Sequence, residues 1–286
     1  MSFVESEIAS QPDCWARAVD LDLRVTQPGE RVAVVGCGTS WFMGMAYAAL
    51  REAAGHGATD AFPASEALLG RDYDHVVAIT RSGTTTEVID LLRDTKTPST
   101  VLTAVPGSPA TGFADRTIAL DFADERSVVQ TRFATTALAA LRVSLGERLD
   151  GAIADVRAVL ADENPPEGGQ FTFLGRGWTV GLAHEAALKL REAAGAWTES
   201  YPAMEYRHGP ISVAEPGRVT WVFGPTPAGL AADVAATGAT LVESGHRDPM
   251  AHLALAQRVA VAAARRGGLD PDRPRNLTRS VILPGA

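Results

Sequence analysis

The sequence predicts an α/β protein made of two tandem domains, each with a parallel sheet between layers of helices. Short apolar runs, typical of buried strands, alternate along the chain with longer Ala-rich or amphipathic segments, typical of helices. Such alternation favours parallel sheets of the flavodoxin-like, three-layer type. The chain also repeats itself: the segment at Val34 matches the one at Phe173, and the segment at Phe62 matches the one at Tyr201. Both matches have an offset of 139 positions, which indicates a duplication rather than chance.

Each half contains its own series of strands and helices. In the first half the pattern predicts strands at residues 31–35, 76–80, 100–104 and 116–120. The helices of that half are expected at residues 41–54, 87–94 and 131–145. In the second half the pattern predicts strands at residues 170–174, 219–223 and 240–243, and helices at residues 182–194 and 253–264.

A polar stretch rich in Pro and Gly, at residues 162–169, predicts a linker between the two halves. We therefore expect a first domain at residues 1–150, which includes an N-terminal lead-in helix, and then a helix end and linker at residues 151–169. The second domain is expected at residues 170–272. A charged tail at residues 273–286 is expected to fold back and close the site.

The bulk composition limits the classes of ligand and the location. Of the 286 residues, 46% are hydrophobic and 21% charged, which is typical of a globular protein with a large core. The net charge of −8 argues against a nucleic-acid partner. The two cysteines, Cys14 and Cys37, have neither disulfide nor metal-ligand spacing, and no metal or other cofactor is expected. We find no secretory signal and no membrane-spanning apolar run, so the cytoplasm is the expected location.

The segment Thr-Arg-Ser-Gly-Thr-Thr-Thr-Glu at residues 80–87 predicts a phosphate-binding loop. It lies between an apolar strand and the start of an amphipathic helix, so backbone N–H groups and the positive end of the helix dipole face any ligand there. Four hydroxyls and the Arg81 guanidinium add further donors. The alternative is ordinary helix capping, in which Thr84 and Glu87 form a capping box. Capping does not explain Gly83 or the adjacent arginine.

A second turn after a strand, Gly36-Cys37-Gly38, partly matches a dinucleotide-binding fingerprint. The third glycine of that fingerprint is replaced by Trp41, and in the repeat by Val180, so close helix–strand packing is blocked. A nucleotide cofactor is therefore not expected. The glycines are better explained by a tight turn that exposes Thr39 and Ser40 to a ligand.

Five motifs together resemble one family. Residues 36–40, 82–83, 187–192, 205–210 and 274–281 are similar, in the same order, to motifs of the sugar-isomerase (SIS) fold. The chain most resembles the isomerase half of glucosamine-6-phosphate synthase, also called glutamine–fructose-6-phosphate aminotransferase. No part of the chain resembles the glutaminase half of that enzyme, so we expect no glutaminase activity.

The resemblance implies roles for individual residues, a phosphorylated sugar as ligand and a homodimer. Residues expected to bind the sugar phosphate are Thr39, Ser40, Thr80, Arg81, Ser82, Gly83 and Thr85, and residues expected to contact the sugar are Gly38 and Gln130. Glu192 is expected to move a proton between C1 and C2, as a carboxylate can. Lys189 is expected to orient Glu192. His208 is expected to open the sugar ring from the partner subunit.

Each of these assignments has a structural alternative. Glu192 and Lys189 have the spacing of an ordinary ion pair on a helix surface, and His208, before Gly209 and Pro210, has the position of a turn residue. Arg279 stands where the synthase has a catalytic lysine, and arginine does not lose its proton in proteins. Arg279 can still stabilise a developing enediolate, or bind an anionic group.

The functional expectation is an aldose–ketose isomerase or aminosugar-phosphate deaminase that acts on a hexose 6-phosphate derivative. The alternative is a catalytically inactive, regulatory protein that binds a sugar phosphate. The sequence leaves the identity of the sugar phosphate open.

Overall fold

The computed structural model describes residues 2–21, 23–161 and 165–284. Residues 162–164 of the predicted linker and the last two residues of the predicted tail lie outside this set. The chain divides into two compact units. The first unit comprises Asp13–Leu149 and Thr278–Ala286, and the second unit comprises Met1–Pro12 and Asp150–Leu277.

The N-terminal segment was expected in the first domain, but residues 1–12 group with the second unit, and residues 278–286 of the tail group with the first unit. The lead-in helix α1 (Phe3–Ala9) packs in the second unit against α9 (Pro249–Arg266). The Asp272 carboxylate accepts hydrogen bonds from the N–H groups of Phe3 (2.7 Å) and Val4 (2.8 Å) at the start of α1. A carboxylate at a helix N-terminus satisfies unpaired donors and stabilises the helix dipole. These contacts explain why α1 belongs with the second unit.

The sheet of the first unit is parallel and has the strand order β2-β1-β3-β4-β5. Its strands are β1 (Val32–Gly36), β2 (Thr59–Pro63), β3 (His75–Ile79), β4 (Ser99–Thr103) and β5 (Arg116–Ala119). This is the flavodoxin-like order, which reverses direction between β1 and β3. Because β1 pairs directly with β3, the loops that follow these two strands emerge side by side at one edge of the sheet.

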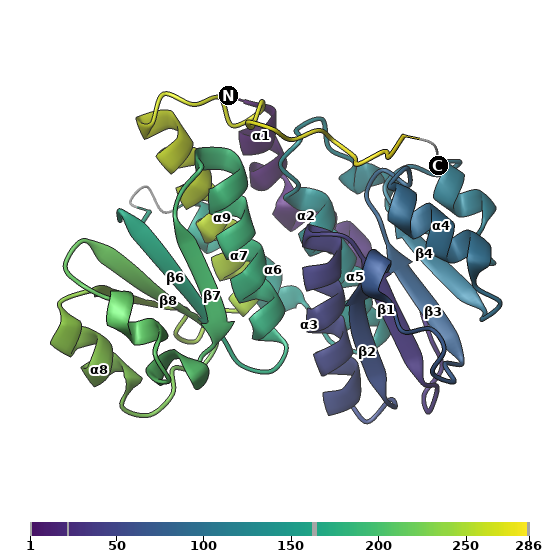
Figure 1. Cartoon of the computed structure of the whole chain (residues 1–286), viewed down its shortest axis with the longest axis horizontal. Helices are drawn as coiled ribbons and strands as arrows, with labels where there is room; N and C mark the ends of the chain where they lie inside the picture. Colours follow the sequence, from purple (N-terminus) through teal and green to yellow (C-terminus); the bar gives the residue numbers. More distant parts are fainter. Residues whose placement is uncertain (1, 22, 162–164, 285–286) are drawn as a thin grey trace. The chain divides into compact units, whose positions relative to one another are not determined.

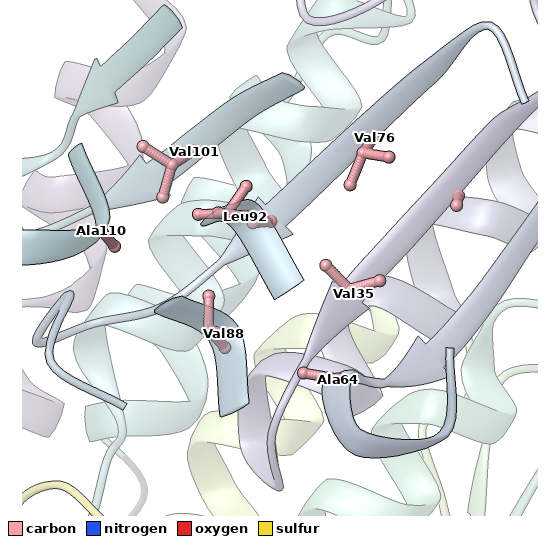
Figure 2. Close-up of a cluster of buried hydrophobic side chains, with 9 residues drawn as sticks. Val35, Ala64, Val76, Val88, Leu92, Val101 and Ala110 are labelled. Atoms are coloured by element: carbon pink, nitrogen blue, oxygen red, sulfur yellow. The ribbon is translucent and has the colours of Figure 1, made fainter. Parts of the chain in front are cut away.

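Helices cover both faces of this sheet (Figure 1). On one face, α3 (Thr39–Ala53) packs against β1 and against α5 (Arg132–Ser144). On the other face, Val88 and Leu92 of α4 (Thr86–Asp94) join a buried cluster with Val35 of β1 and Val101 of β4, as Figure 2 shows. Successive strand residues point to opposite faces, so each strand contributes to both layers of the core.

The sheet of the second unit is also parallel, with the order β7-β6-β8-β9. Its strands are β6 (Gln170–Gly175), β7 (Thr198–Pro202), β8 (Arg218–Phe223) and β9 (Thr240–Glu243). The α-helices of this unit other than α1 and α9 are α6 (Asp150–Ala161), α7 (Thr179–Ala194) and α8 (Leu230–Thr237). Helix α2 (Gln11–Val19) spans the boundary between the units in the chain.

The two faces of the second sheet have different cores. One face carries a row of aromatic side chains, which stack or tilt against one another and reach His252 of α9: Phe171, Phe173, Trp221 and Phe223. The opposite face carries Leu174 and Val222, which pack with Tyr206 and with Leu230 and Val234 of α8. The sheet is therefore buried on both sides, as its nearly continuous apolar strands predict.

The repeat seen in the sequence is also a repeat of backbone geometry. A Cβ atom on Gly36 would lie 2.8 Å from Ser40 backbone, and one on Gly175 would lie 2.2 Å from Thr179 backbone. Both glycines are therefore required because a helix starts directly above the end of a strand. A bulkier residue at either position would displace that helix.

The predicted α/β class with parallel, helix-flanked sheets is confirmed, and every predicted strand and helix is present with small shifts at its ends. The prediction missed β2, β7, α2 and α8, and it expected only a helix end where the separate helix α6 lies. Strands β2 and β7 lie at the edges of their sheets and are only partly buried, so their apolar signal is weak. The Pro-Ala-x-Glu segments that follow them form short 3-10 turns. The 3-10 helices of the described chain are Ala64–Glu66, Pro109–Gly112, Asp121–Ala123, Glu205–Arg207 and Pro210–Val213.

Among the described residues, every helix is too short or too polar to cross a membrane.

Candidate functional site

The loop after β1 places two hydroxyl residues at the beginning of α3. Gly38 is the N-cap residue of α3 and has φ of +52°, and Thr39 and Ser40 follow it as the first helical residues. Both are more than nine-tenths buried. This turn brings the N-terminal end of α3 to the carboxyl edge of the first sheet, next to the loop after β3.

The loop after β3 contains Thr80, Arg81 and Ser82, all buried, and Gly83 in the left-handed region with φ of +62°. A Cβ atom on Gly83 would lie 1.8 Å from the Ser108 hydroxyl oxygen, so packing within the protein already requires glycine here. The N-cap residue of α4 is Thr85, and its side chain makes no capping hydrogen bond. The capping box suggested for Thr84 and Glu87 is therefore not the arrangement that forms. Hydroxyls of this loop instead form hydrogen bonds with the C-terminal tail.

The hydroxyls of this loop converge on one atom of the C-terminal tail. The Ser280 Oγ lies 3.1 Å from Ser82 Oγ, 2.9 Å from Thr84 Oγ1 and 3.5 Å from Thr85 Oγ1. We call these four residues the hydroxyl cluster. The tail backbone adds to it, because the Thr86 N–H at the start of α4 donates to the Val281 carbonyl (3.2 Å). The oxygen of Ser280 thus occupies a position surrounded by donors, as a ligand oxygen would.

Arg81 lies beside the hydroxyl cluster and is held mainly by carbonyl groups. Its terminal nitrogens donate to the carbonyls of Ser127 (3.1 Å) and Arg279 (2.8 Å). Its Nε is buried and has no hydrogen-bond partner among the described residues, and the same is true of the Gln130 Nε2. Buried donors without partners are costly, and they are often explained by a ligand that the fold is built to receive.

Glu125, which the sequence did not single out, positions this arginine. Its Oε2 lies 3.6 Å from an Arg81 nitrogen, and both side chains are almost completely buried. Its Oε1 accepts hydrogen bonds from the N–H groups of Thr131 (2.7 Å) and Arg132 (2.6 Å), so it also holds the start of α5. No sequence signal identifies it, since it lies in a loop and its partners are brought together only by the fold.

Arg279 is engaged with the protein itself. Its guanidinium pairs with Asp124 and donates through Nε to the Glu125 carbonyl (3.2 Å). Its own carbonyl accepts from Arg81. These contacts anchor the tail beside the hydroxyl cluster. The catalytic role expected for Arg279 stays a prediction.

In the second unit, Lys189 lies between two carboxylates of the same helix. Its Nζ lies 2.5 Å from Glu192 Oε2 and 3.4 Å from Glu185 Oε1. Lys189 and Glu185 are fully buried, whereas the Glu192 side chain is 19% exposed. An exposed surface pair of the kind considered for this spacing is therefore excluded for Lys189. The arrangement holds Glu192 with one face toward solvent, where it lines a cavity of about 510 Å³.

His208 follows the 3-10 turn Glu205–Arg207 and is exposed. Its N–H donates to the Glu205 carbonyl (2.9 Å), and it is not among the residues that line the cavity at Glu192. The neighbouring Tyr206 side chain is buried, and its hydroxyl forms a hydrogen bond with the Thr220 hydroxyl. These contacts hold the turn in place. An exposed histidine on a fixed turn is compatible with the expected role toward a partner subunit, which stays a prediction.

Comparison with known proteins confirms the resemblance that the motifs predicted. The chain is 29% identical to glutamine–fructose-6-phosphate aminotransferase (isomerizing) of Sulfurisphaera tokodaii, over 89% of this chain and 50% of that protein. The same enzyme of Pyrobaculum aerophilum is 26% identical over 98% of this chain and 57% of that protein. The chain thus spans about half the length of the curated relatives that it matches. No protein-family model matches it.

Solved structures show the same fold. Glucosamine-6-phosphate deaminase from Thermotoga maritima superposes with a TM-score of 0.83 and 22% identity, over 99% of this chain and 100% of that one. The C-terminal domain of glucosamine-fructose-6-phosphate aminotransferase from Francisella tularensis superposes with a TM-score of 0.76 and 22% identity, over 96% and 98% of the two chains. At this level of identity the likeness concerns the fold.

Proposed function

We propose that this chain is a phosphosugar isomerase built from two copies of one domain, and that the first unit binds the phosphate of its substrate at the hydroxyl cluster. The observation that supports this most is the position of the cluster. It lies at the carboxyl edge of the first sheet where the strand order reverses, which is where ligands bind in open parallel sheets. A phosphate dianion requires several hydrogen-bond donors and positive charge. The donors here are the hydroxyls of the cluster, the N–H groups at the start of α4, and Arg81 Nε and Gln130 Nε2, which have no partner among the described residues.

The chemistry assigned to the second unit is proton transfer between neighbouring carbons. Glu192 takes the proton from C2 of the aldose, or from C1 of the ketose, and returns it to the adjacent carbon of the enediol, while the hydroxyl proton on one carbon moves to the carbonyl oxygen on the other. This exchange needs no cofactor. Lys189 is a positioning residue, because its ion pairs to Glu192 and Glu185 hold the carboxylate in one orientation. Binding of a remote, non-reacting group such as the phosphate supplies energy that positions the reacting carbons of the substrate.

Two finer assignments belong to the same proposal. The substrate is a hexose 6-phosphate or its 2-amino derivative, so that release of ammonia can accompany the isomerisation. His208 assists ring opening across a homodimer interface, in keeping with its exposure and its fixed turn. Sedimentation of the protein as a monomer at all concentrations would contradict the assigned role of His208.

Turnover assays test the proposal directly. Glucosamine 6-phosphate, fructose 6-phosphate with ammonia, and fructosamine 6-phosphates are each incubated with the protein, and products are followed by NMR. Glu192→Gln should lower kcat by at least about 100-fold while leaving the affinity for the sugar phosphate within a few-fold. Glu215→Gln is the matched control, because Glu215 lies in the same unit in an exposed ion pair with Arg218. Absence of turnover with every substrate, with binding intact, would exclude an enzyme.

One observation favours binding without turnover as a second candidate. The tail anchors Arg279 in contacts with Asp124 and Glu125, and the Ser280 hydroxyl lies at the centre of the hydroxyl cluster. A regulatory protein that senses a sugar phosphate would exchange this tail contact for the ligand. In that case Glu192→Gln would leave both the affinity and the absent turnover unchanged.

A further inference from the structure

One cavity of the first unit lies at the edge of the sheet where the strands begin. Its volume is about 240 Å³, and the first residues of three strands line it: His75 of β3, Ser99 of β4 and Arg116 of β5. The hydroxyl cluster follows the other end of β3, and these strands are parallel. The cavity is therefore separate from the proposed phosphate site, and the proposed reaction gives its residues no role.

Two guanidinium groups and two carboxylates line this cavity, and no ion pair among the described residues joins one to another. The arginines are Arg24 and Arg116, and the acidic residues are Glu30 and Asp115. Arg116 donates to two neutral acceptors, the Thr100 hydroxyl (3.2 Å) and the Val25 carbonyl (2.6 Å). Arg24 makes no side-chain hydrogen bond within the described chain. The positive charges of the cavity are thus not neutralised by its negative ones.

The two carboxylates are also held by neutral groups. Asp115 accepts hydrogen bonds from the Ser99 N–H (2.7 Å) and the Ser99 hydroxyl (3.1 Å). These hydrogen bonds lower the pKa of Asp115, so its carboxylate is ionised at neutral pH. Glu30 accepts a hydrogen bond from the Gln27 N–H (2.7 Å). In each case a single carboxylate oxygen is used, and the other oxygen has no donor within the described chain.

A buried arginine fixes the wall of the cavity that carries Glu30. Arg51 of α3 is fully buried, and its guanidinium donates to the Thr26 hydroxyl (3.0 Å) and to the carbonyls of Gln27 (2.7 Å) and Glu30 (3.0 Å). It also donates to the Thr59 hydroxyl of β2 (2.8 Å), which ties this wall to the sheet. The wall is therefore formed before a ligand arrives, and the cost of ordering it on binding is small.

His75 contributes an uncharged donor to the same cavity. Its Nε2 lies 2.8 Å from Thr100 Oγ1, the oxygen that also accepts from Arg116. A hydroxyl that accepts from arginine still has its own proton to give, so Thr100 donates to Nε2 and the ring proton of His75 lies on Nδ1. Burial lowers the pKa of His75, so the ring is neutral near pH 7. The charges that line the cavity are therefore two positive and two negative.

We propose that this cavity binds a small zwitterion, a free α-amino acid. Guanidinium groups bind a carboxylate through parallel hydrogen bonds, and carboxylate oxygens accept from an ammonium group, so such a ligand pairs both signs of charge. A phosphate would also meet the two carboxylates, and a polyamine would also meet the two arginines, so like charges oppose both. The cavity is smaller than the roughly 300–1,000 Å³ of sites for drug-sized ligands, which suits a molecule of amino-acid size.

The experiment compares an amino acid with derivatives that each lack one charge. Thermal-shift measurements with every proteinogenic amino acid identify the strongest binder, and calorimetry then compares it with its N-acetyl derivative and its α-amide. Each derivative should bind about tenfold or more weakly than the parent amino acid, as expected for the loss of hydrogen bonds between charged groups. Arg24→Gln and Glu30→Gln should each lower the affinity for the parent by about tenfold. Glutamine at position 30 can still accept from the Gln27 N–H, so this variant removes only the charge.

Arg31→Gln and Glu66→Gln are the matched controls, because both residues are exposed in the same unit and neither lines the cavity. They should keep the affinity of the wild type. Absence of binding by every amino acid would overturn the inference, and so would a derivative that binds as tightly as the parent. An affinity that neither cavity variant changes would place the ligand elsewhere and overturn it as well. Because the hydroxyl cluster lies at the other edge of the sheet, each of these results leaves the proposed function standing.

Discussion

A guanidinium nitrogen of Arg81 lies 3.6 Å from a carboxylate oxygen of Glu125, and both side chains are almost entirely buried. The other oxygen of Glu125 holds the start of α5, so the arginine of the proposed phosphate site is tied to the framework of the first unit. Arg81 is thereby held in one orientation, and its Nε has no hydrogen-bond partner among the described residues. A site of this kind requires little rearrangement on binding.

Replacement of Glu125 by glutamine should destabilise the first unit. The change removes the negative charge near a buried arginine and weakens the hydrogen bonds that begin α5, so the free energy of unfolding should fall by roughly 3 kcal/mol. Urea unfolding, followed by circular dichroism, measures this. Asp90→Asn, which breaks an exposed ion pair with Arg93, should cost no more than about 0.5 kcal/mol. A Glu125→Gln protein as stable as the Asp90→Asn control would refute the importance of the buried pair.

A carboxylate at position 280 should compete with a bound phosphate. Ser280 Oγ lies 2.9 Å from Thr84 Oγ1 at the centre of the hydroxyl cluster, so Ser280→Glu places negative charge where the phosphate is proposed to bind. The affinity for fructose 6-phosphate, measured by calorimetry, should fall at least about tenfold through like-charge repulsion. Thr117→Glu, at an exposed position of the edge strand β5 in the same unit, adds the same charge away from the tail and should change the affinity little. Unchanged binding by Ser280→Glu would place the phosphate elsewhere.

Stability should decline as the pH falls from about 6.5 to about 4 because of His252. This side chain is buried against Trp221, and its pKa is lowered to about 4, mainly by burial, with a smaller contribution from Arg247 and an opposing one from Asp155. The unfolded chain, with a pKa near 6.5, therefore binds more protons than the folded chain in this range, and unfolding becomes easier with acid. The contribution at pH 4 is about 3 kcal/mol.

The matched variant for this prediction is His252→Phe, which keeps an aromatic ring beside Trp221. It should flatten the pH dependence of the free energy of unfolding between pH 4 and 6.5. The slope should not vanish, since burial also lowers the pKa of His184 and of His75. A slope identical to that of the wild type would show that His252 binds its proton equally well in the folded and the unfolded protein.

Cys37 should react slowly with alkylating reagents although it lies in the turn of the proposed site. Burial and the nearby Glu87 charge raise its pKa to about 11, so very little thiolate is present near neutral pH. At pH 7.5 iodoacetamide should modify it at least about 100-fold more slowly than free cysteine. Mass spectrometry of the folded protein measures the rate, with the urea-unfolded protein as control. Equal rates in the two states would show that the thiol is neither buried nor protonated.

The loop at residues 80–87 illustrates what could be predicted from the chain and what could not. The position of residues 80–87 between an apolar strand and an amphipathic helix predicted a loop at the carboxyl edge of a sheet, and the structure has it there. The helix cap at Thr84, considered as the alternative, did not form, because the hydroxyl turns toward Ser280, almost two hundred positions away in the chain. Local patterns carry no information on such distant partners.

Apolar periodicity and turn chemistry act over a few residues, so the amino-acid pattern was enough to predict the α/β class, the duplication and the order of most strands and helices. The folded chain was needed to find that Glu125 holds Arg81, that the tail enters the hydroxyl cluster and that Glu192 lines a cavity. These relationships depend on which loops the parallel strands bring to the same edge of the sheet. They also depend on where the C-terminal tail packs after the last helix. Such proximity is set by the packing of the whole unit rather than by any local run of residues.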